Sequence, residues 1–340
     1  MLIVKLNNSI ASQRGTVIIT VLMLVAVATY LAVEMTYRQR IDITRTGTLL
    51  ALSQSEEYVK SAEALAQYVL EQDLISDIKS NEFTDHMGED WPTKVVKPIG
   101  RGLVQGEIFD LEGRFNLNLL RSSNTQIQTL ASEQLEQLLL GVGIPSNSSS
   151  NTSALSVANR IEDWVDEGGT PEIDGLESQD YLLFDPPYQT SNRVLVDLSE
   201  LMLISGLSID DLNLLAEHVA LLPPQARLNI NTASDTVLAL TPCLDISAIN
   251  AQRTQGDITD SELNVLDAGG GPYVISGCTP AIVQGYFSVK SRFFLLDAKS
   301  EVDKKTIHMH SVLYRPETTT AADVKVKVIL RKHLDPFSGV

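Results

Sequence analysis

The sequence predicts an α+β protein that is anchored in a membrane at its N-terminus. An uncharged apolar stretch covers residues 16–33, and an amphipathic helical pattern continues from there to about residue 80. Short alternating segments fill residues 95–118 and the region after residue 286, and helical periodicity occupies the chain between them. A long N-terminal helix, strands at two places in the chain and helices between them together define this fold class.

Composition sets limits on the function. The chain has 340 residues, 44% of them hydrophobic, and a net charge of -17. This apolar fraction is that of a globular protein, and the length suits about two domains. Residues 1–45 hold five basic and two acidic residues, so the remaining chain carries -20. Such a body argues against nucleic acid as the partner of the whole chain, because phosphate binding requires clustered positive charge.

The apolar stretch Thr16–Val33 predicts a transmembrane helix. At about 1.5 Å per residue it is just long enough to span a hydrocarbon core of roughly 30 Å. A cleaved secretory signal is the alternative, but it would require a small-residue cleavage site after the stretch. Glu34 and Arg38 follow instead. We therefore expect residues 16–80 to form one N-terminal helix whose first part, 16–33, spans the membrane.

The residues before the span resemble a type IV prepilin leader. A short basic segment ends in Gln13-Arg14-Gly15, and the apolar helix begins at Thr16. The resemblance implies a leader over residues 1–15 that a prepilin peptidase removes after Gly15, which leaves Thr16 as the mature N-terminus. Most pilins carry glutamate at the fifth mature residue, and this chain has Thr20 there.

The middle of the chain begins with strands. Residues 95–118 alternate between apolar and polar, with tight turns expected at Gly106 and Gly113. Helical periodicity follows over residues 125–140 and again over 195–222, separated by a Ser/Asn-rich loop at 146–153 and by an acidic segment. The strands after residue 286 alternate as an antiparallel sheet with one solvated face does.

Four segments in order along the chain resemble the minor pseudopilin K family of type II secretion systems: Asp110–Asn118, Ile161–Asp166, Leu222–Pro224 and Leu228–Ala233. The absence of the fifth-position glutamate is also a mark of that family. The resemblance implies a pilin-like α+β fold, in which the long helix packs on an antiparallel sheet. It further implies two β parts, at 81–119 and 281–335, and a mostly helical insertion domain at 120–280.

The family resemblance also implies a function. Such a protein is a subunit at the tip of the secretion pseudopilus, is anchored in the inner membrane and has its bulk in the periplasm. Its partners would be the minor pseudopilins I and J, other pseudopilins, inner-membrane secretion components and exported protein substrates. The sequence has no P-loop, no G-x-S-x-G and no H-E-x-x-H motif, which favours a subunit without enzymatic activity.

An acidic run after residue 162 is the candidate metal site. Seven carboxylates within eighteen positions suit a hard cation such as calcium, although a solvated acidic loop has the same composition. Family members bind calcium in this loop, which favours a site for one or two ions. The expected ligands are Asp166, Asp174, Glu177 and Asp180, and further candidates are Asp163, Glu167 and Glu172. We expect Asp163 to act mainly as a hydrogen-bond acceptor at the helix end beside Trp164.

A membrane-anchored helix-hairpin-helix DNA receptor is the alternative function. The segment Asn229–Ala233 also opens such modules, which continue into a glycine-containing hairpin that approaches phosphate. Here that hairpin position reads Leu240-Thr-Pro-Cys-Leu244, with neither glycine and with acidic residues on both sides. We therefore expect no nucleic acid partner.

The cysteines and histidines remain. Cys243 and Cys278 would form a disulfide in an oxidising compartment, and two buried thiols are the alternative. His308 and His310 share one face of a predicted strand, but no third ligand is close in sequence. We therefore expect them to be ordinary surface residues.

Substituting Gly15→Ala is expected to block removal of the leader. Glycine lets a backbone approach another surface closely, and a methyl group beside the scissile bond would obstruct this. Intact-mass spectrometry should find the wild-type chain beginning at a methylated Thr16 and the variant retaining residues 1–15. Gly47→Ala, which lies within the predicted helix 16–80 and far from the cleavage site, should be processed normally. A mature mass for the Gly15 variant would contradict the prepilin interpretation.

Overall fold

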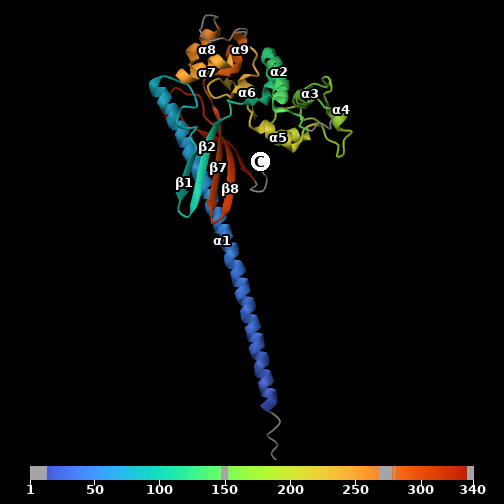
Figure 1. Cartoon of the computed structure of the whole chain (residues 1–340), viewed down its shortest axis with the longest axis vertical. Coiled ribbons are helices and arrows are strands. Elements are labelled where there is room, and N and C mark those ends of the chain that lie inside the picture. Colours follow the sequence, from blue (N-terminus) through green and yellow to red (C-terminus); the bar gives the residue numbers. More distant parts are fainter. Residues whose placement is uncertain (1–13, 147–151, 268–277, 279, 335–340) are drawn as a thin grey trace, which may run out of the picture.

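The computed structural model describes residues 14–146, 152–267, 278 and 280–334. Residues 1–13 of the predicted leader and the end of the second predicted β part, from residue 335, lie outside the described residues. The fold is α+β, as predicted: a long N-terminal helix, a five-stranded antiparallel sheet and a group of short helices (Figure 1).

The first element is a single unbroken helix, α1 (Arg14–Ser80), of 67 residues. Its N-terminal part contains an 18-residue window with a mean hydropathy of 2.5, no residue of which is buried. This part projects from the body of the molecule, and none of the described residues packs around it (Figure 1). Length and composition therefore make it a candidate membrane span, in the place that the sequence predicts.

The C-terminal half of α1 packs on the sheet. Its buried side chains recur every three or four residues, which places them on one face of the helix. They are Ala51, Ser55, Val59, Glu63, Ala66, Leu70 and Leu74. Val59, Ala66 and Leu70 share a core with Ile108, Phe294, Leu296 and Met309 of the sheet and with Trp91. The amphipathic pattern beyond residue 50 is thus the seam between helix and sheet.

The sheet has the order β1-β2-β7-β8-β9, and each neighbouring pair is antiparallel. Its strands are β1 (Val95–Ile99), β2 (Gly102–Asp110), β7 (Phe293–Val302), β8 (Lys305–Tyr314) and β9 (Lys327–Leu334). Asp303 and Lys304 join β7 to β8 and both have positive φ, which matches the right-handed twist of a two-residue hairpin.

One predicted turn is wrong. Gly106 lies inside β2, opposite Val95 and Ala298. The turn between β1 and β2 is instead at Gly100, whose φ of 57° is left-handed. Gly113 does follow the end of β2 in a turn, and a Cβ there would lie 2.8 Å from the Thr232 hydroxyl. Gly113 therefore permits a close approach between segments far apart in sequence.

A large insertion separates β2 from β7. It contains the helices α2 (Thr125–Val142), α3 (Ala154–Val165), α4 (Ser178–Tyr181), α5 (Ile209–Ala216), α6 (Asp235–Leu238), α7 (Ile246–Gln255), α8 (Asp260–Asp267) and α9 (Pro280–Tyr286). It also holds the 3₁₀ turns η1 (Leu117–Arg121) and η2 (Leu198–Leu203), and two parallel pairs, β3 (Phe115–Asn116) with β4 (Val219–Ala220) and β5 (Leu228–Asn229) with β6 (Phe287–Ser288). Asp110 of β2 lies opposite Phe294 of β7, so the insertion leaves and returns at one end of the sheet.

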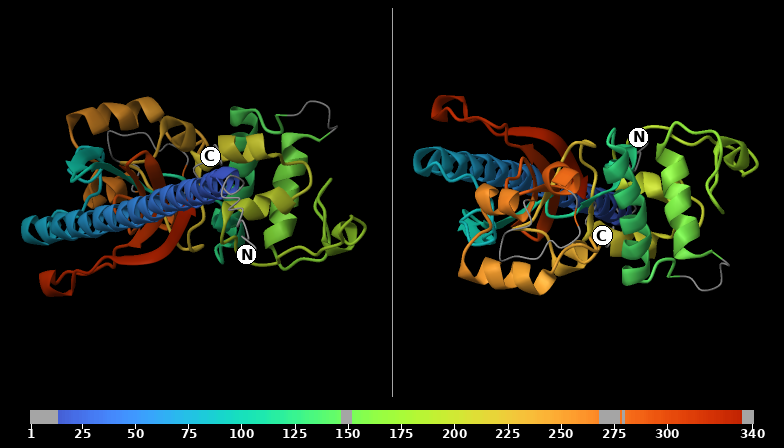
Figure 2. Two further views of the ribbon diagram at one scale, coloured as in Figure 1. Left: turned by 90° about the horizontal axis from the view of Figure 1, so that it is seen from below. Right: turned by 90° about the horizontal axis from the view of Figure 1, so that it is seen from above.

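The insertion has a hydrophobic core of its own around α2 and α3. Leu135, Leu138, Ile161, Trp164 and Tyr181 are among its buried members. The helices lie at the end of the molecule farthest from the candidate membrane span, and α2 and α3 extend sideways from the axis of α1 (Figures 1 and 2). The bulk of the insertion is therefore remote from the membrane-facing part of α1.

The predicted helical stretch 195–222 is broken. The chain forms η2, then α5, then β4. The reason is local: Asp197 and Ser208 each form a capping box, with Glu200 and Asp211, so a new helical segment starts at each. Gly206 lies between them with a φ of 100°. The apolar residues keep a helical spacing across these helix starts, so the spacing alone predicted one continuous helix.

One buried carboxylate ties α1 to the last two strands. Glu63 accepts hydrogen bonds from Arg331 Nε at 2.8 Å, from Arg331 Nη2 at 2.6 Å and from the Ser311 hydroxyl at 2.6 Å. Burial acts to raise the pKa of Glu63, but the hydrogen bonds from Arg331 and Ser311 outweigh it and lower the pKa below its ordinary value.

This lowered pKa predicts a stability loss at acid pH. The contribution of Glu63 is fully present above the unfolded-state pKa of about 4.3 and is lost as pH falls through the lower folded-state pKa. Glu63→Gln should therefore reduce the free energy of unfolding by about 1–3 kcal/mol at pH 7, and by much less at pH 3. Urea unfolding followed by tryptophan fluorescence measures the difference. Glu57→Gln, which removes an exposed pair with Lys60, should cost less than about 1 kcal/mol at either pH. Equal losses for Glu63→Gln at pH 7 and pH 3 would contradict the assignment.

Candidate functional site

Three of the four segments that resemble the family, Asp110–Asn118, Leu222–Pro224 and Leu228–Ala233, meet at a buried polar junction between the sheet and the insertion. Asp110, at the end of β2, accepts hydrogen bonds from the hydroxyls of Thr232 and Ser291, each at 2.5 Å, and from Asn229 Nδ2 at 3.3 Å. Its other oxygen accepts the Glu112 amide at 2.8 Å. Burial raises the pKa of Asp110 to about 6, although these hydrogen bonds act in the opposite direction. One carboxylate thus joins the end of β2, the middle of the insertion and the approach to β7.

Two asparagines extend this junction. Asn116 Oδ1 accepts the Leu222 amide at 3.0 Å, and its Nδ2 donates to the Pro223 carbonyl at 3.0 Å. Asn118 Oδ1 accepts the Leu195 amide at 2.7 Å, and its Nδ2 donates to the carbonyls of Leu195 and Leu222, each at 3.0 Å. Both side chains are buried. Asparagine is suited to this role because one side chain both donates and accepts.

The segment Asn229–Ala233 faces inward. Asn229 Nδ2 donates to the Asp85 carbonyl at 3.0 Å and to the Ser291 hydroxyl at 2.7 Å. Asn231 exchanges two hydrogen bonds with the backbone of Ile258, each at 2.9 Å. Arg253, a cation that a DNA site would need at the surface, donates to the carbonyls of Ile230 and Ala233. The DNA-receptor alternative therefore has no support in this segment.

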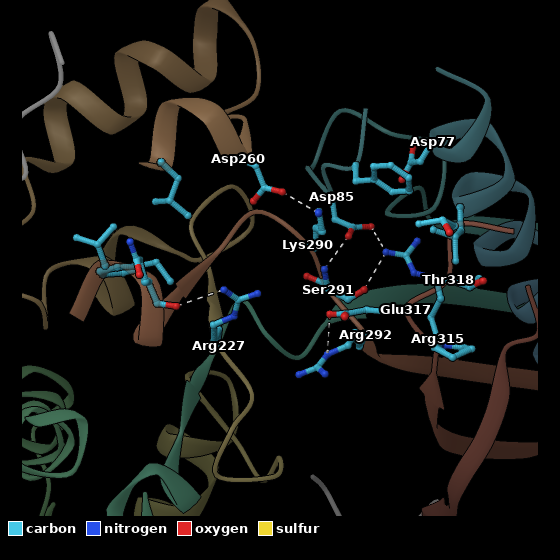
Figure 3. Close-up of a pocket in the computed structure, with 18 residues that line it drawn as sticks. Asp77, Asp85, Arg227, Asp260, Lys290, Ser291, Arg292, Arg315, Glu317 and Thr318 are labelled. Carbon is cyan, nitrogen blue, oxygen red and sulfur yellow. Dashed lines mark hydrogen bonds and ion pairs between the residues drawn. The ribbon is translucent and has the colours of Figure 1, made fainter. Parts of the chain in front are cut away.

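A buried arginine closes the junction on the α1 side. Arg315 donates to Asp73 at 2.7 Å. It also donates to Asp85 and to the Ser291 carbonyl at 2.8 Å (Figure 3). Its guanidinium carbon lies 4.8 Å from the centre of the Phe294 ring. Sequence reasoning missed this residue, because a single arginine at the end of a strand carries no local signal of its partners.

A cleft of about 890 Å³ opens beside Arg315 between the sheet and the insertion. Charges of both signs line it, and several of them are paired with each other or with backbone (Figure 3). Lys290 contacts Asp260 at 2.7 Å, and Arg227 donates to the Gln284 carbonyl at 3.3 Å. The Lys290 contact joins α8 to the segment just before β7, and the Arg227 contact lies within the insertion, so polar contacts hold the walls of the cleft beside the end of the sheet.

The acidic segment after α3 has two carboxylates at its centre. Asp163 is fully buried at the end of α3, and its Oδ1 accepts the Glu172 amide at 3.1 Å. Among the described residues, Asp163 Oδ2 and Glu177 Oε1 are buried without a hydrogen-bond partner. Burial, and then the charges of Glu177, Asp166 and Glu172, raise the pKa of Asp163 to about 6 against the effect of the Glu172 amide. An unpaired carboxylate oxygen of this kind is costly unless a cation satisfies it.

Among the described residues, the acidic segment does not bring three ligand oxygens within 4.8 Å of one another, and several of the other predicted ligands have partners of their own. Asp166 Oδ1 accepts the Gly168 amide at 2.9 Å, and Asp180 Oδ2 accepts the Glu177 amide at 2.9 Å in a capping box at the start of α4. Asp174 has a φ of 58°, and its carbonyl accepts from Arg160 at 3.2 Å. Glu167 is turned away and pairs with Arg121 at 2.5 Å.

Gly175 fits this arrangement closely. A Cβ at this position would collide with the Asp163 carboxylate, so the loop approaches α3 only because residue 175 has no side chain. Two buried carboxylate oxygens without a hydrogen-bond partner are the feature of this segment that a hard cation would satisfy. Asp163 was predicted mainly as a hydrogen-bond acceptor. One of its oxygens does accept a hydrogen bond, and the other is buried without a partner.

Comparison with known proteins assigns the family. Residues 113–224 match the family model "Type II secretion system (T2SS), protein K". The type II secretion system protein K of Pseudomonas aeruginosa is 35% identical over 232 residues, which cover 67% of either chain. The chain belongs to the protein K family. Protein K of Pectobacterium carotovorum is 25% identical over 334 residues, covering 94% of this chain and 96% of that protein. The matched residues 113–224 of the protein K family model include part of the buried junction and the whole acidic segment.

A solved structure supports the fold of this protein K family member. It is the crystal structure of the GspK-GspI-GspJ complex from the enterotoxigenic Escherichia coli type 2 secretion system. The likeness has a TM-score of 0.69 and 24% sequence identity, and covers 86% of this chain and 99% of that chain. The pilin-like architecture with a long helix and an antiparallel sheet is therefore shown.

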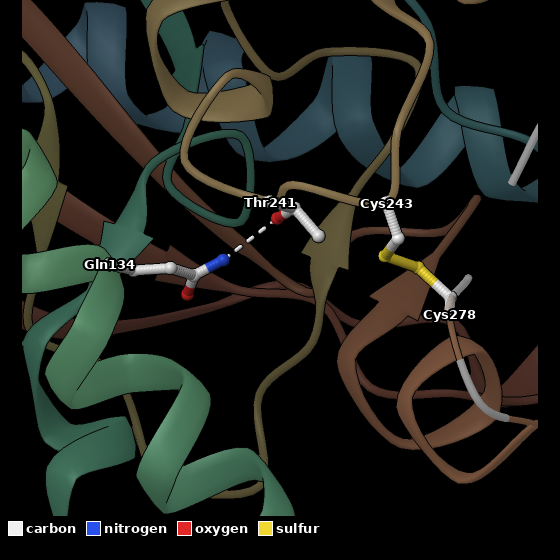
Figure 4. Close-up of a disulfide and its surroundings, with 4 residues drawn as sticks. All are labelled: Gln134, Thr241, Cys243 and Cys278. Carbon is white, nitrogen blue, oxygen red and sulfur yellow. Dashed lines mark hydrogen bonds between the residues drawn. A yellow bond between two sulfur atoms is a disulfide. The ribbon is translucent and has the colours of Figure 1, made fainter. Parts of the chain in front are cut away.

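The structure of this protein K family member joins Cys243 and Cys278 in a disulfide, with Cα atoms 5.2 Å apart (Figure 4). The bridge closes a loop over a sequence separation of 35, which in the chain-entropy model stabilises the fold by about 4 kcal/mol. Thr241, two residues before Cys243, accepts a hydrogen bond from Gln134 of α2 at 2.7 Å. The disulfide segment is thereby tied to the insertion core.

The two histidines lie at the surface of the sheet, as expected, but the premise that no third ligand is near them is wrong. His308 and His310 do have a third polar neighbour, Asp297 of β7, and the three side chains form one cluster. The sequence could not show this, because Asp297 is close only through the register of β7 against β8.

Proposed function

We propose that this protein K is the tip subunit of a type II secretion pseudopilus and helps to start its assembly together with minor pseudopilins I and J. In this proposal α1 is held in the inner membrane, and the sheet and the insertion lie in the periplasm. The observation that carries the proposal is the position of the insertion, at the end of the molecule opposite the membrane span (Figure 1).

The insertion supports a terminal position by its bulk. It leaves and returns at the end of the sheet farthest from the span, and α2 and α3 extend sideways from there. A subunit stacked beyond this end of the fibre would meet these helices. The insertion core is continuous with the buried junction, so the helices do not swing aside as a separate flexible arm would.

Thr20 supports the same position by its chemistry. In pilins a glutamate at this place is thought to pair with the terminal amine of a neighbouring subunit, a strong contact in a medium of low dielectric. The Thr20 hydroxyl instead donates to the Val17 carbonyl of its own helix at 2.9 Å. It offers no negative charge to a neighbour, which fits a subunit that has no neighbour above it to supply an amine.

A face of α1 supports docking of the partners. Leu65 and Tyr68 lie in the half of α1 that packs on the sheet, but their side chains are exposed. Leu65 borders an apolar groove of about 140 Å³ that Val69, Trp91 and Ile99 also line. The GspK-GspI-GspJ complex is an assembly of three different chains. In the present chain, this groove is an apolar surface on which a partner subunit would dock.

Co-purification tests the assembly proposal. The full-length chain, extracted in detergent, should bring down the minor pseudopilins I and J that are co-expressed with it. Leu65→Asp should reduce their recovery at least tenfold, because it places a charge in the groove. Leu183→Asp, at an exposed leucine of the insertion, should leave recovery unchanged. Failure of the wild-type chain to retain either partner would overturn the proposal.

We also propose that the acidic segment binds one or two calcium ions. In this proposal Asp163 and Glu177 form the centre of the site, and Asp166, Asp174 and Asp180 of the same segment supply further oxygens. A bound cation would satisfy the two orphaned oxygens and hold the loop against α3. The fit rests on oxygen donors alone, which calcium prefers.

Chelation tests the calcium proposal. Calcium at about 100 times its Kd should stabilise the native chain by about 2.7 kcal/mol, so EGTA should lower the melting temperature by several degrees. Glu177→Gln should abolish this response and also stabilise the calcium-free chain, because it relieves repulsion between the two central carboxylates. Glu167→Gln, whose residue pairs with Arg121, should respond as the wild type does. An unchanged melting temperature on chelation of the wild-type chain would contradict the proposal.

A further inference from the structure

Two imidazoles and one carboxylate converge on the face of the sheet opposite α1. His308 and His310 are two residues apart on β8, so their side chains project to the same face. Met309 between them is fully buried against the α1 side, which puts both histidines on the outer face. Asp297 of β7 lies directly opposite His310 in the register of the two strands.

The donor atoms of the three residues are close together. His308 Nε2 contacts Asp297 Oδ1, and His310 Nε2 lies 3.7 Å from the same oxygen. All three donor atoms lie within 4.8 Å of one another. In a tetrahedral zinc site with bonds of about 2.0–2.1 Å, neighbouring ligand atoms are about 3.3 Å apart. Side-chain adjustments of about 1.5 Å or less therefore bring these three atoms to ligand positions.

We propose that Asp297, His308 and His310 bind a zinc ion, with the fourth position open to water. Two imidazoles and one carboxylate form a recurrent three-ligand zinc set in proteins, with the remaining position left to solvent. Calcium does not suit this cluster, because calcium takes oxygen ligands almost exclusively. The site is thus distinct in chemistry and in place from the acidic segment of the insertion.

The strands hold the ligands in place. β7 and β8 pair over ten residues each without a register shift in the part that carries the cluster. The side chains of the three residues are about one-third exposed, so an ion can reach them from solvent. A site on paired strands is more rigid than one on a loop, and rigidity favours a metal with a fixed geometry.

Charges of both signs surround the cluster: Lys299 of β7 lies directly opposite His308 with its side chain exposed, and Arg114 acts electrostatically on His310. Lys332 of β9 lies directly opposite His310, but its Nζ pairs with Asp197 of the insertion at 3.2 Å. On the other side, Glu107 of β2 lies opposite Asp297 and is 3.4 Å from Lys94. The Lys332–Asp197 pair joins β9 to the insertion, and β9 is the strand next to β8, which carries both histidines.

An ordinary ion pair explains only part of this cluster. A protonated His308 beside Asp297 would form a common surface pair. A second imidazole with its ring centre 5.2 Å away is not needed for that pair, and two protonated rings at this separation would repel each other. A shared divalent cation accounts for all three residues.

Zinc binding to the full-length chain in detergent tests the proposal. The chain should carry an affinity tag without histidine, and EGTA-treated protein should be titrated with zinc chloride by calorimetry. The expected result is one saturable zinc site per chain. His308→Ala, His310→Ala or Asp297→Asn should weaken it at least tenfold. His333→Ala is the matched control, because His333 pairs with Met309 in register and therefore projects to the α1 face of the sheet; it should bind as the wild type does.

Cobalt substitution gives an independent readout. Cobalt(II) in a four-coordinate site absorbs visible light much more strongly than cobalt in water, so the wild type should gain such a band and the three ligand variants should not. Circular dichroism confirms that the variants are folded. The proposal is overturned if the wild type binds no zinc at a stoichiometry of one, or if His333→Ala weakens binding as much as His310→Ala does. Excess calcium that displaces the zinc would also overturn it.

Discussion

The distal half of the molecule depends on how the ends of β2 and β7 are held together. These antiparallel neighbours would normally be joined by a short hairpin, and here the whole insertion takes the place of that loop. A long closed excursion costs little more entropy than a short one, since the cost rises only with the logarithm of length. Its attachment must nevertheless be fixed, and the Asp110 carboxylate does this by accepting hydrogen bonds from the insertion and from Ser291 near β7.

Arg315 extends the same constraint to α1. It joins Asp73 on the helix to Asp85 in the loop that follows, and Asp85 in turn accepts the Ser291 amide at 2.6 Å. The hydrogen-bond network of the junction therefore runs from the helix through the sheet end into the insertion. Removing one partner from such a buried network leaves an uncompensated charge, which costs more than the net contribution of an intact pair. Helix, sheet and insertion are consequently coupled, and the insertion keeps a defined orientation relative to α1.

The sequence predicted the features that repeat along the chain. The span, the buried face of α1 and the strand regions all follow from apolar spacing, because periodicity is a local property. Features set by register or by distant contacts did not follow. Asp297 lies beside His310 only because their strands pair, and Arg315 binds Asp73, which is more than 200 residues away in sequence. Gly106 was predicted to form a turn, but it lies inside a paired strand. The segments Asp110–Asn118 and Leu228–Ala233 were visible in the sequence, but only the fold shows that they meet at the Asp110 carboxylate.

Two groups of buried carboxylates in this chain have opposite requirements. Asp110 and Asp85 have hydrogen-bond donors from the protein for their oxygens, so their burial completes the structure without an ion. Asp163 has one amide donor for two oxygens, and Glu177 keeps an oxygen with none among the described residues. The hydrogen-bond donors around a buried carboxylate, and not the local density of acidic residues, therefore distinguish the two groups. A buried carboxylate with protein donors on its oxygens stabilises the fold. A buried carboxylate oxygen without a donor carries an uncompensated negative charge, which a cation would neutralise.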